Sequence, residues 1–331
     1  MASKKKDPLG VQPAPVTGSR LPVPRTREIR QRSSAARQLL EDGWIEHAPQ
    51  RAIIDELLDY RDETVGRLGR PLSGRRLSQF SQAGKSKTMA RLKAELSEER
   101  EAAGLPPNPY QVVIVELDRR LNLKGFYQEV LRKLDDEFWD ADVSAKVLEN
   151  RIADFVRRLG VELLIADEVQ HLKRKANDAN EVSDRFKVFL DRGIVPLVLV
   201  GDEDSVEFFR ANGKLAARLG RPLELAPLAP RTSARDAKLF KAFCASLDDA
   251  LKENGIFTYP SKFTAIDTLY ALLDVSGGHV GRVARLVGVA ASDAVRRGAD
   301  CVEPYDLSRA TREFAIGAGW VINDPFSKVG A

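Results

Sequence analysis

The chain has few cysteines and no long apolar run, and each shortage excludes a class of protein. Only Cys244 and Cys301 are present among 331 residues, far apart and without a CxxC spacing. A disulfide framework or a zinc site is therefore not expected, and both thiols should be in the core or half-buried. No run approaches the roughly 18 apolar residues of a membrane span, and the start, MASKKKDPLG, lacks a secretory apolar stretch. We expect a cytoplasmic protein without membrane contact.

Positive charge is concentrated at the N-terminus. Residues 1–38 hold nine Lys or Arg against two acidic residues, a net charge of +7 where the whole chain carries +4. The basic pI therefore reports this tail and not a basic folded surface. Residues 1–27 combine five prolines with Gly, Ser and basic residues, so we expect a disordered arm. The arm is either an inert tail or a docking segment for a partner protein or nucleic acid phosphates.

Strand-like and helical patterns alternate through the middle of the chain. Apolar or short strand-like runs occur at 75–80, 111–117, 161–166, 194–202 and 223–225. Helical spacing between them, at 125–138, 145–159 and 181–192, predicts a parallel five-stranded sheet with helices on both faces. Four helical patterns and no strand follow, at 232–253, 261–274, 280–297 and 304–315. We expect a basic arm at 1–27 and a helical lead-in at 28–70, followed by an α/β core at 71–230. A small all-helical lid domain at 231–316 and a tail at 317–331 should complete the chain.

Two adjacent carboxylates end the third apolar run. Asp167 and Glu168 follow Val161–Ala166, and a buried strand does not carry such a pair without a use for it. In a phosphate-handling site, Asp167 would hold Mg²⁺, directly or through its waters, and Glu168 would orient and polarise the attacking water. The alternative is a strand followed by an acidic helix start.

A phosphate-binding loop is indicated at residues 79–86. The pattern GxxxxGK[ST] places backbone N–H groups and a lysine around phosphates and a hydroxyl on Mg²⁺. Gly84, Lys85 and Ser86 fill its last three fixed positions, between Ala83 and Lys87, whereas Gln79 replaces the first glycine. This departure puts the affinity for nucleotide in question.

These features fall at the ends of expected strands. The GKS loop follows the first strand, Asp167 and Glu168 end the third, and Asp202 ends the fourth. Because ligands of parallel α/β sheets bind at the carboxyl ends of the strands, the three sites should meet. The sequence therefore predicts a nucleotide and Mg²⁺ site at this edge.

The order of these motifs resembles the AAA+ P-loop ATPases and, among them, the TniB family of transposition proteins, relatives of TnsC. The specific points are LLIADEVQHL around Glu168, VPLVLVGDEDS leading to KLAARLGRPLEL, and the ending NDPF. The resemblance covers roughly residues 40–326. It implies a bacterial, cytoplasmic ATPase that uses ATP and Mg²⁺ and forms a ring or filament on duplex DNA.

The resemblance also implies roles for single residues. Lys85 and Ser86 would bind phosphates and Mg²⁺, and Asp202 occupies the sensor-1 region. Arg218 resembles the arginine that reaches a neighbouring subunit's γ-phosphate. Arg282 lies near the sensor-2 position of the lid, and His171 is expected to be structural or signalling. The candidates for non-specific DNA contact are basic residues after two strands: Arg119, Arg120, Lys124, Lys173, Arg174 and Lys175.

The resemblance implies an ATP-dependent regulator that recruits or activates a transposase, with a TniQ-like targeting protein as a further partner. Two other interpretations remain open. One is a scaffold that binds nucleotide with weak or no hydrolysis, which Gln79 favours and Glu168 opposes. The other is a helicase-loader-type ATPase, which shares the core but usually adds a winged-helix or helicase-binding segment.

Overall fold

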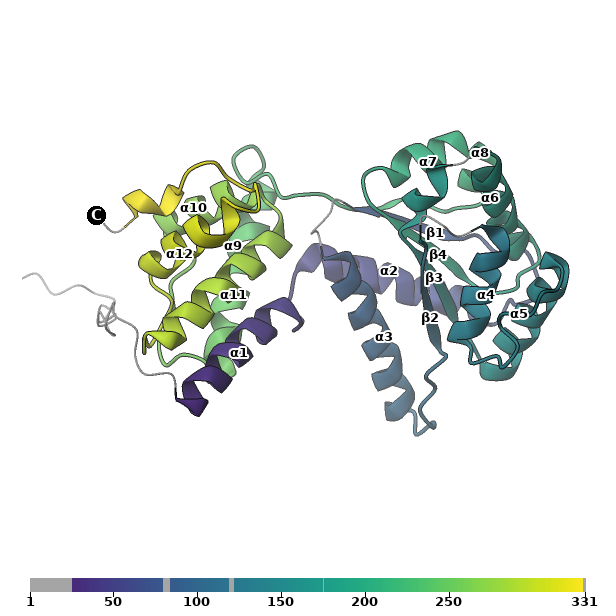
Figure 1. Cartoon of the computed structure of the whole chain (residues 1–331), viewed down its shortest axis with the longest axis horizontal. Helices are drawn as coiled ribbons and strands as arrows, with labels where there is room; N and C mark the ends of the chain where they lie inside the picture. Colours follow the sequence, from purple (N-terminus) through teal and green to yellow (C-terminus); the bar gives the residue numbers. More distant parts are fainter. Residues whose placement is uncertain (1–25, 80–83, 119–121, 175, 330–331) are drawn as a thin grey trace, which may run out of the picture. The chain divides into compact units, whose positions relative to one another are not determined.

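The computed structural model describes residues 26–79, 84–118, 122–174 and 176–329, without the side chains of Gln79, Leu123, residues 172–182 and Lys328. Contacts divide the chain into two compact units. One unit spans Glu46–Pro227, and the other combines the chain up to Ile45 with Leu228–Ala331. Each unit is described by itself below (Figure 1).

The first unit contains the expected parallel sheet. Its strands are β1 Arg75–Gln79, β2 Val112–Glu116, β3 Leu163–Asp167, β4 Leu197–Gly201 and β5 Leu223–Leu225. They lie in the order β2-β3-β4-β1-β5, and every neighbouring pair is parallel. Strand β4 therefore separates β1 from β3. The carboxyl end of β1 and the carboxylates at the end of β3 therefore flank the end of β4.

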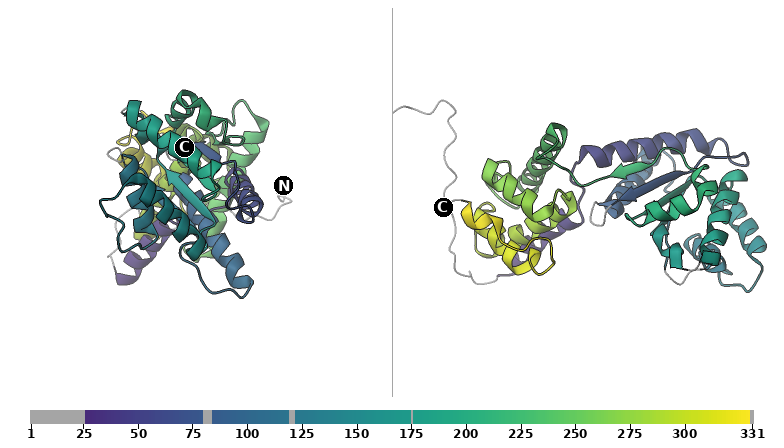
Figure 2. Two further views of the ribbon diagram at one scale, coloured as in Figure 1. Left: turned by 90° about the vertical axis from the view of Figure 1, so that its right-hand side faces the viewer. Right: turned by 90° about the horizontal axis from the view of Figure 1, so that it is seen from above.

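Helices cover both faces of this sheet. Their bounds are α2 Ala48–Val65, α3 Lys85–Ala102, α4 Leu123–Lys133, α5 Ala145–Leu159, α6 Ala176–Asp191, α7 Ser205–Ala211 and α8 Gly213–Ala216. Helices α2 and α3 lie on one face and α4, α5 and α6 on the other (Figures 1 and 2). A 3₁₀ turn, Val169–Arg174, follows β3 directly. The result is a three-layer α/β unit.

The central strands are buried on both faces, as their continuous apolar runs require. On the α4–α6 side, Val115 and Ala166 pack with a cluster of aromatic rings. Tyr127 and Phe189 stack there with centroids 5.7 Å apart. Ile165, which points to the opposite face, is fully buried as well. This packing fixes the strand ends that carry the polar residues of the site.

The second unit is helical. It contains α1 Arg27–Glu41, α9 Ala234–Glu253, α10 Ile266–Ser276, α11 Val280–Arg296 and α12 Pro304–Ala310, a π turn Thr311–Ala315 and a 3₁₀ turn Pro325–Lys328. Helix α1 lies along α11 (Figure 1). The Oγ atoms of Ser33 and Ser292 are 2.8 Å apart across this contact. Arg32 Nε donates to the Ile256 carbonyl at 2.8 Å.

The lead-in expected at 28–70 is shared between the two units. Helix α1 belongs to the helical unit and α2 to the sheet unit, with the division between Ile45 and Glu46. The cause is the apolar stripe of α1, because Ala36 and Leu40 are fully buried in the core of the helical unit. This unit resumes at Leu228, three residues before the expected start at 231.

Two helices differ from the sequence prediction, for local reasons. The helix expected over 125–138 ends at Lys133, since Asp135 adopts φ +53° and Asp136 Oδ1 accepts from the Phe138 N–H at 3.0 Å. The helix expected from 261 begins only at Ile266. The Asp248 carboxylate accepts the N–H groups of residues 261 and 262 and holds that segment out of the helix.

Both thiols are buried and free, as expected from their spacing. Among the helices in the described part of the chain, none combines the length and apolarity that crossing a membrane requires.

Candidate functional site

The end of the candidate phosphate loop is anchored by α2. Gly84 caps α3 at φ +91°, a conformation that favours glycine. A Cβ there would lie 2.5 Å from Gln50 Nε2. The same amide donates to the Gly84 carbonyl at 3.2 Å and to Thr88 Oγ1 at 3.0 Å. Glycine is thus required at this position, and Gln50, which sequence analysis did not identify, holds the start of α3.

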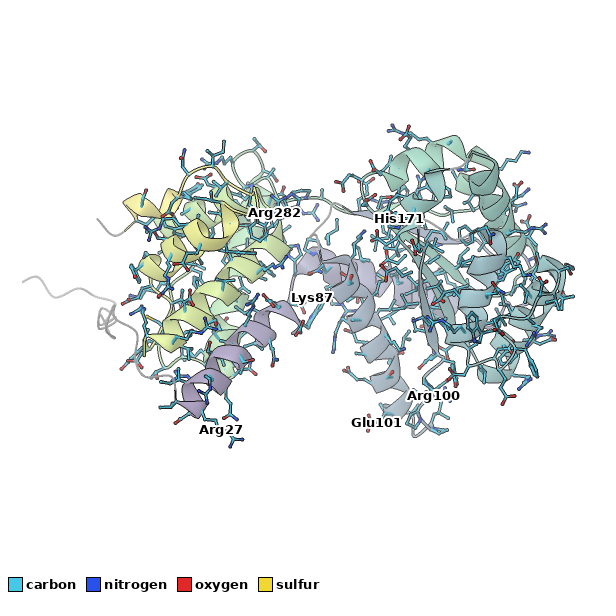
Figure 3. All side chains as sticks on the ribbon, viewed as in Figure 1. Arg27, Lys87, Arg100, Glu101, His171 and Arg282 are labelled. Carbon is cyan, nitrogen blue, oxygen red and sulfur yellow. The ribbon has the colours of Figure 1, made fainter. Side chains whose placement is uncertain are left out.

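The first turn of α3 places its charged and hydroxyl groups at the carboxyl end of β1. Lys85 is only 10% exposed, and its Nζ lies 3.2 Å from Glu168 Oε1. Ser86 is exposed, and Lys87, which Figure 3 labels, is half-buried. The free N–H groups of a helix N-terminus and the lysine form an arrangement suited to an anion. Ala83 and the rest of 80–83 lie outside the described residues, so the effect of Gln79 stays a question.

Asp167 and Glu168 occupy the end of β3, as expected. Asp167 Oδ1 accepts the Glu168 N–H at 2.8 Å, and Glu168 adopts φ +63°. A residue with a side chain is uncommon in this left-handed region, and such backbone strain concentrates at functional sites. Burial raises the pKa of Asp167, while this hydrogen bond and the charge of Lys85 oppose the shift. The buried carboxylate therefore favours a cation beside it.

The residues after Glu168 connect it to neighbouring strands. Gln170 Nε2 donates to Glu168 Oε2 at 2.5 Å, and Gln170 Oε1 accepts the Asp202 N–H at 3.3 Å. His171 Nδ1 donates to the Leu117 carbonyl at 2.8 Å, and its Nε2 lies 4.0 Å from Glu168 Oε2. His171 is therefore tied to the end of β2 (Figure 3). Sequence analysis quoted Gln170 only as part of a motif, and its position two residues after Glu168 was the available signal.

Asp202 begins the loop after β4, at the same edge. Its Oδ1 accepts the Asp204 N–H at 2.9 Å, and its carbonyl accepts from Ser205 Oγ at 2.6 Å. Ser205 Oγ lies 2.9 Å from Ser78 Oγ and so joins β4 to β1. Burial raises the pKa of Asp202, opposed by its hydrogen bond to Asp204 and by Lys85. The predicted strand ends thus meet around Lys85.

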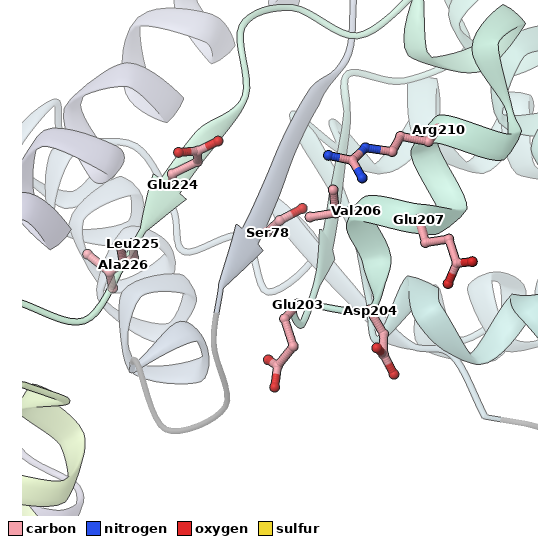
Figure 4. A pocket seen from close by; sticks show the side chains of 9 residues that line it. All are labelled: Ser78, Glu203, Asp204, Val206, Glu207, Arg210, Glu224, Leu225 and Ala226. Atoms are coloured by element: carbon pink, nitrogen blue, oxygen red, sulfur yellow. The ribbon is translucent and has the colours of Figure 1, made fainter. Parts of the chain in front are cut away.

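A pocket of about 620 Å³ lies beside these strand ends. Its walls come from the ends of β1 and β5 and from the start of α7 (Figure 4). Glu203, Glu207 and Glu224 supply acidic groups, and Arg210 supplies a basic one. Sequence analysis did not identify this pocket, because its lining residues come from separate segments that only the fold brings together.

Arg218 is not part of this edge. Its carbonyl accepts the Gly74 N–H at 2.9 Å, which places it at the amino end of β1, opposite the phosphate loop. Its guanidinium forms an ion pair with Asp191 at 3.0 Å. Arg282 belongs to the helical unit, where it lies 5.6 Å from the centre of the Trp320 ring (Figure 3).

The structure tests little of the predicted DNA contacts. Arg119, Arg120 and Lys175 lie outside the described residues. Lys173 and Arg174 belong to the 3₁₀ turn after β3, and their side chains are not described. Lys124 forms an ion pair with Asp142. All six remain predictions.

Solved structures with the same fold are AAA+ ATPases of the ORC and Cdc6 type. The ORC2 protein of Aeropyrum pernix in ADPNP–ADP complexes matches with a TM-score of 0.60 at 15% identity, over 84% of this chain and 71% of that chain. The A. pernix ORC1 protein in complex with DNA gives 0.57 at 16% identity, over 84% and 69%. Cdc6p from Pyrobaculum aerophilum gives 0.58 at 14% identity, over 83% and 70%. A comparison with curated proteins gave no match.

The parallel sheet, the lysine at the start of α3 and the carboxylates ending β3 define a P-loop ATPase fold of the AAA+ class. Residues 36–226, more than half of the chain, match the family described as bacterial TniB protein. The chain belongs to the TniB family.

Proposed function

We propose that this protein is an ATP-dependent, DNA-binding regulator of DNA transposition. Copies of the chain assemble as a ring or filament on duplex target DNA, recruit or activate a transposase, and use Mg²⁺-dependent ATP hydrolysis as the switch. The observation that carries the proposal is the pairing of Lys85 with Glu168 beside Asp167, in a chain of the TniB family.

The residues at the sheet edge fit a nucleotide and its metal ion. The N-terminus of α3 and Lys85 offer positive charge to phosphate oxygens. Ser86 and Asp167 offer a hydroxyl and a carboxylate, which are oxygen ligands suited to Mg²⁺. The raised pKa of Asp167 is the observation that favours a cation there. When bound, Mg-ATP supplies the reacting phosphoryl group.

Glu168 is the residue that polarises water. It follows Asp167 directly, and its Oε1 faces Lys85 in this structure. Once Lys85 binds phosphate, Oε1 is released and accepts a hydrogen bond from the attacking water. Lys85 thus links phosphate binding to exposure of the catalytic carboxylate.

Arg218 completes the site of a neighbouring copy. Its position at the amino end of β1 keeps it from the phosphate loop of its own sheet unit. With 45% of its side chain exposed, it is available to a second molecule once it leaves Asp191. Such an arginine stabilises negative charge on the transferred phosphoryl group. Arg282 is proposed as the lid residue that senses nucleotide.

Duplex DNA is proposed to bind through phosphate contacts to basic residues, without sequence specificity. Arg119, Arg120, Lys124 and the run Lys173–Lys175 are the candidates. The protein partners are a transposase and a TniQ-like targeting protein, in the bacterial cytoplasm. The fold shared with the A. pernix ORC1 structure in complex with DNA supports DNA as a ligand.

A second candidate function is that of a helicase-loader-type ATPase, which would share the same AAA+ fold. The two candidates differ in their protein partner. Co-purification with a replicative helicase, and not with a transposase, would favour the second one.

DNA binding measured by fluorescence anisotropy tests the proposal. The purified full chain should bind labelled duplex DNA more tightly in ATP than in ADP, and less tightly as salt rises. Lys85→Ala should lose the ATP effect, whereas Lys93→Ala, on an exposed position of the same helix, should keep it. The absence of ATP-stimulated binding in folded wild-type protein would contradict the proposal.

A further inference from the structure

Gln170 connects two strand ends of the site through a single side chain. Its amide nitrogen binds the Glu168 carboxylate at the end of β3, and its amide oxygen binds the backbone of Asp202 after β4. We propose that Gln170 is a positioning residue for hydrolysis: its amide holds Glu168 Oε2 against the end of β4, so that Oε1 faces the water. This inference rests on the proposed function and concerns its chemical step.

The two partners of this side chain require a donor and an acceptor, and the amide of Gln170 supplies both. The carboxylate of Glu168 requires a donor, whereas the Asp202 N–H requires an acceptor. Gln170 is 8% exposed as a residue, so water does not readily replace either partner. Leucine would fill the space without either hydrogen bond, and glutamate would place a second carboxylate beside Glu168.

Gly201 leaves room for the amide. A Cβ at Gly201 would lie 2.9 Å from Gln170 Oε1 and 2.4 Å from Ser205 Cβ. Real Cβ atoms essentially never approach so closely, so a larger residue would displace the amide or the start of α7. The glycine that ends β4 therefore keeps the contact between Gln170 and the backbone possible.

The side chain of Asp202 has a partner other than Gln170. Its carboxylate accepts the Asp204 N–H at 2.9 Å and is used to close the loop after β4. The contact from the end of β4 to Glu168 therefore passes through its backbone N–H and Gln170.

Glu168 needs such support for two reasons. Its backbone is held at φ +63°, which a glutamate adopts only when surrounding contacts fix it. Its Oε1 faces Lys85, and this contact is given up when the lysine binds phosphate. Gln170 still holds Oε2 in that state. The two oxygens of one carboxylate thus have separate tasks, one for anchoring and one for water.

The test measures DNA-stimulated ATP hydrolysis together with nucleotide affinity and thermal stability. Gln170→Leu should lower kcat roughly 10- to 100-fold, because misplacing a catalytic group by about 1 Å costs up to roughly 100-fold. Its Kd for a fluorescent ATP analogue should stay within about threefold of wild type, since Lys85 and the start of α3 are unchanged. A loss confined to nucleotide affinity or to folding would overturn the proposal.

Gln170→Glu adds a readout that a purely structural role would not change. Protonated, this carboxyl donates to Glu168 and accepts from Asp202, as the amide does. Ionised, it repels Glu168. Its kcat relative to wild type should therefore rise as the pH falls from 8 to 6. A pH profile parallel to that of wild type would contradict the role.

A double-mutant cycle shows through which residue Gln170 acts. If it acts through Glu168, Gln170→Leu should have little further effect on the slow residual hydrolysis rate of Glu168→Gln, measured at high protein concentration. A wild-type protein without turnover would overturn the proposed function and this inference together. An active wild type with an equally active Gln170→Leu would overturn the inference alone.

Discussion

Two groups of charged side chains in this protein differ in how completely their charges are paired. In the helical unit, Arg297 is 6% exposed and binds both oxygens of Asp306 at 2.8 Å, with Glu303 as a further partner. At the nucleotide edge, Asp167, Glu168 and Asp202 surround the single ammonium of Lys85.

In the first group, the charged side chains find their ion-pair and hydrogen-bond partners within the chain. Asp306 Oδ2 also accepts the Glu303 N–H, and the two acidic residues form a capping box at the start of α12. At the nucleotide edge, burial raises the pKa of both Asp167 and Asp202. A cluster whose carboxylates are fully paired and hydrogen-bonded holds the fold, whereas carboxylates whose pKa is raised by burial indicate a place for a ligand. We therefore expect the nucleotide edge to lower the stability of the ligand-free protein.

Breaking the satisfied cluster should have the largest effect on stability. Arg297→Met leaves Asp306, 1% exposed, without its cation, and breaking a buried pair in this way costs about 3–5 kcal/mol. Chemical denaturation of the full chain should show this loss in the transition of the helical unit. Arg296→Met is the matched control, because that arginine is 47% exposed. If the free energy of unfolding of Arg297→Met changed by less than about 1 kcal/mol, the buried cluster would contribute no more than a surface ion pair. The contrast between the two clusters would then fail.

Removing a charge from the nucleotide edge should act in the opposite direction. Asp167→Asn should stabilise the nucleotide-free protein by about 1 kcal/mol at neutral pH, as relief of functional strain commonly does. Because the folded-state pKa of Asp167 is raised, its contribution to stability is present at low pH and is lost as the pH rises through that pKa. The gain from Asn should therefore shrink on acidification.

Thermal unfolding between pH 8 and 4 measures this difference, and the ATPase activity of the same variant should be lost. Asp154→Asn is the matched control, since that residue is 63% exposed. If Asp167→Asn were less stable than wild type at neutral pH, the charge of Asp167 would stabilise the ligand-free protein, which contradicts this account of the nucleotide edge.

Arg218 should have the smallest effect on stability and a large one on activity. Its pair with Asp191 is partly exposed on both sides, and such pairs contribute about 0–1 kcal/mol. Arg218→Ala should unfold like wild type but lose DNA-stimulated turnover, whereas Arg221→Ala should keep it. Mixing Arg218→Ala with Glu168→Gln should restore part of the turnover, because each supplies the group that the other lacks. Turnover unaffected by Arg218→Ala would exclude it from the site.

The sequence predicted the parts of the molecule that depend on local pattern. Apolar runs predicted the strands β2, β3 and β4, and short strand-like segments predicted β1 and β5. The abrupt change from apolar to acidic residues pointed to Asp167 and Glu168. The sequence could not predict that α1 belongs to the helical unit, because Ala36 and Leu40 pack against α11, which lies more than 200 residues away in the chain. Gln170 was not assigned a role because its significance depends on β4 lying beside β3.

Helix ends show the same limit on a smaller scale. The helix expected to reach 138 kept its apolar spacing, but the left-handed backbone at Asp135 ended it earlier. Asp248 acts on residues 261 and 262 from another helix, so no local pattern reveals it. Local spacing predicts that an element exists, and side chains from elsewhere decide where it begins.

ATP turnover with and without duplex DNA, for wild type, Lys85→Ala and Glu168→Gln, tests the central claim most directly. Our account predicts turnover stimulated by DNA in wild type and lost in both variants, with Glu168→Gln still binding DNA in ATP. Folded wild-type protein without turnover would contradict the account, as would a Glu168→Gln variant with full activity.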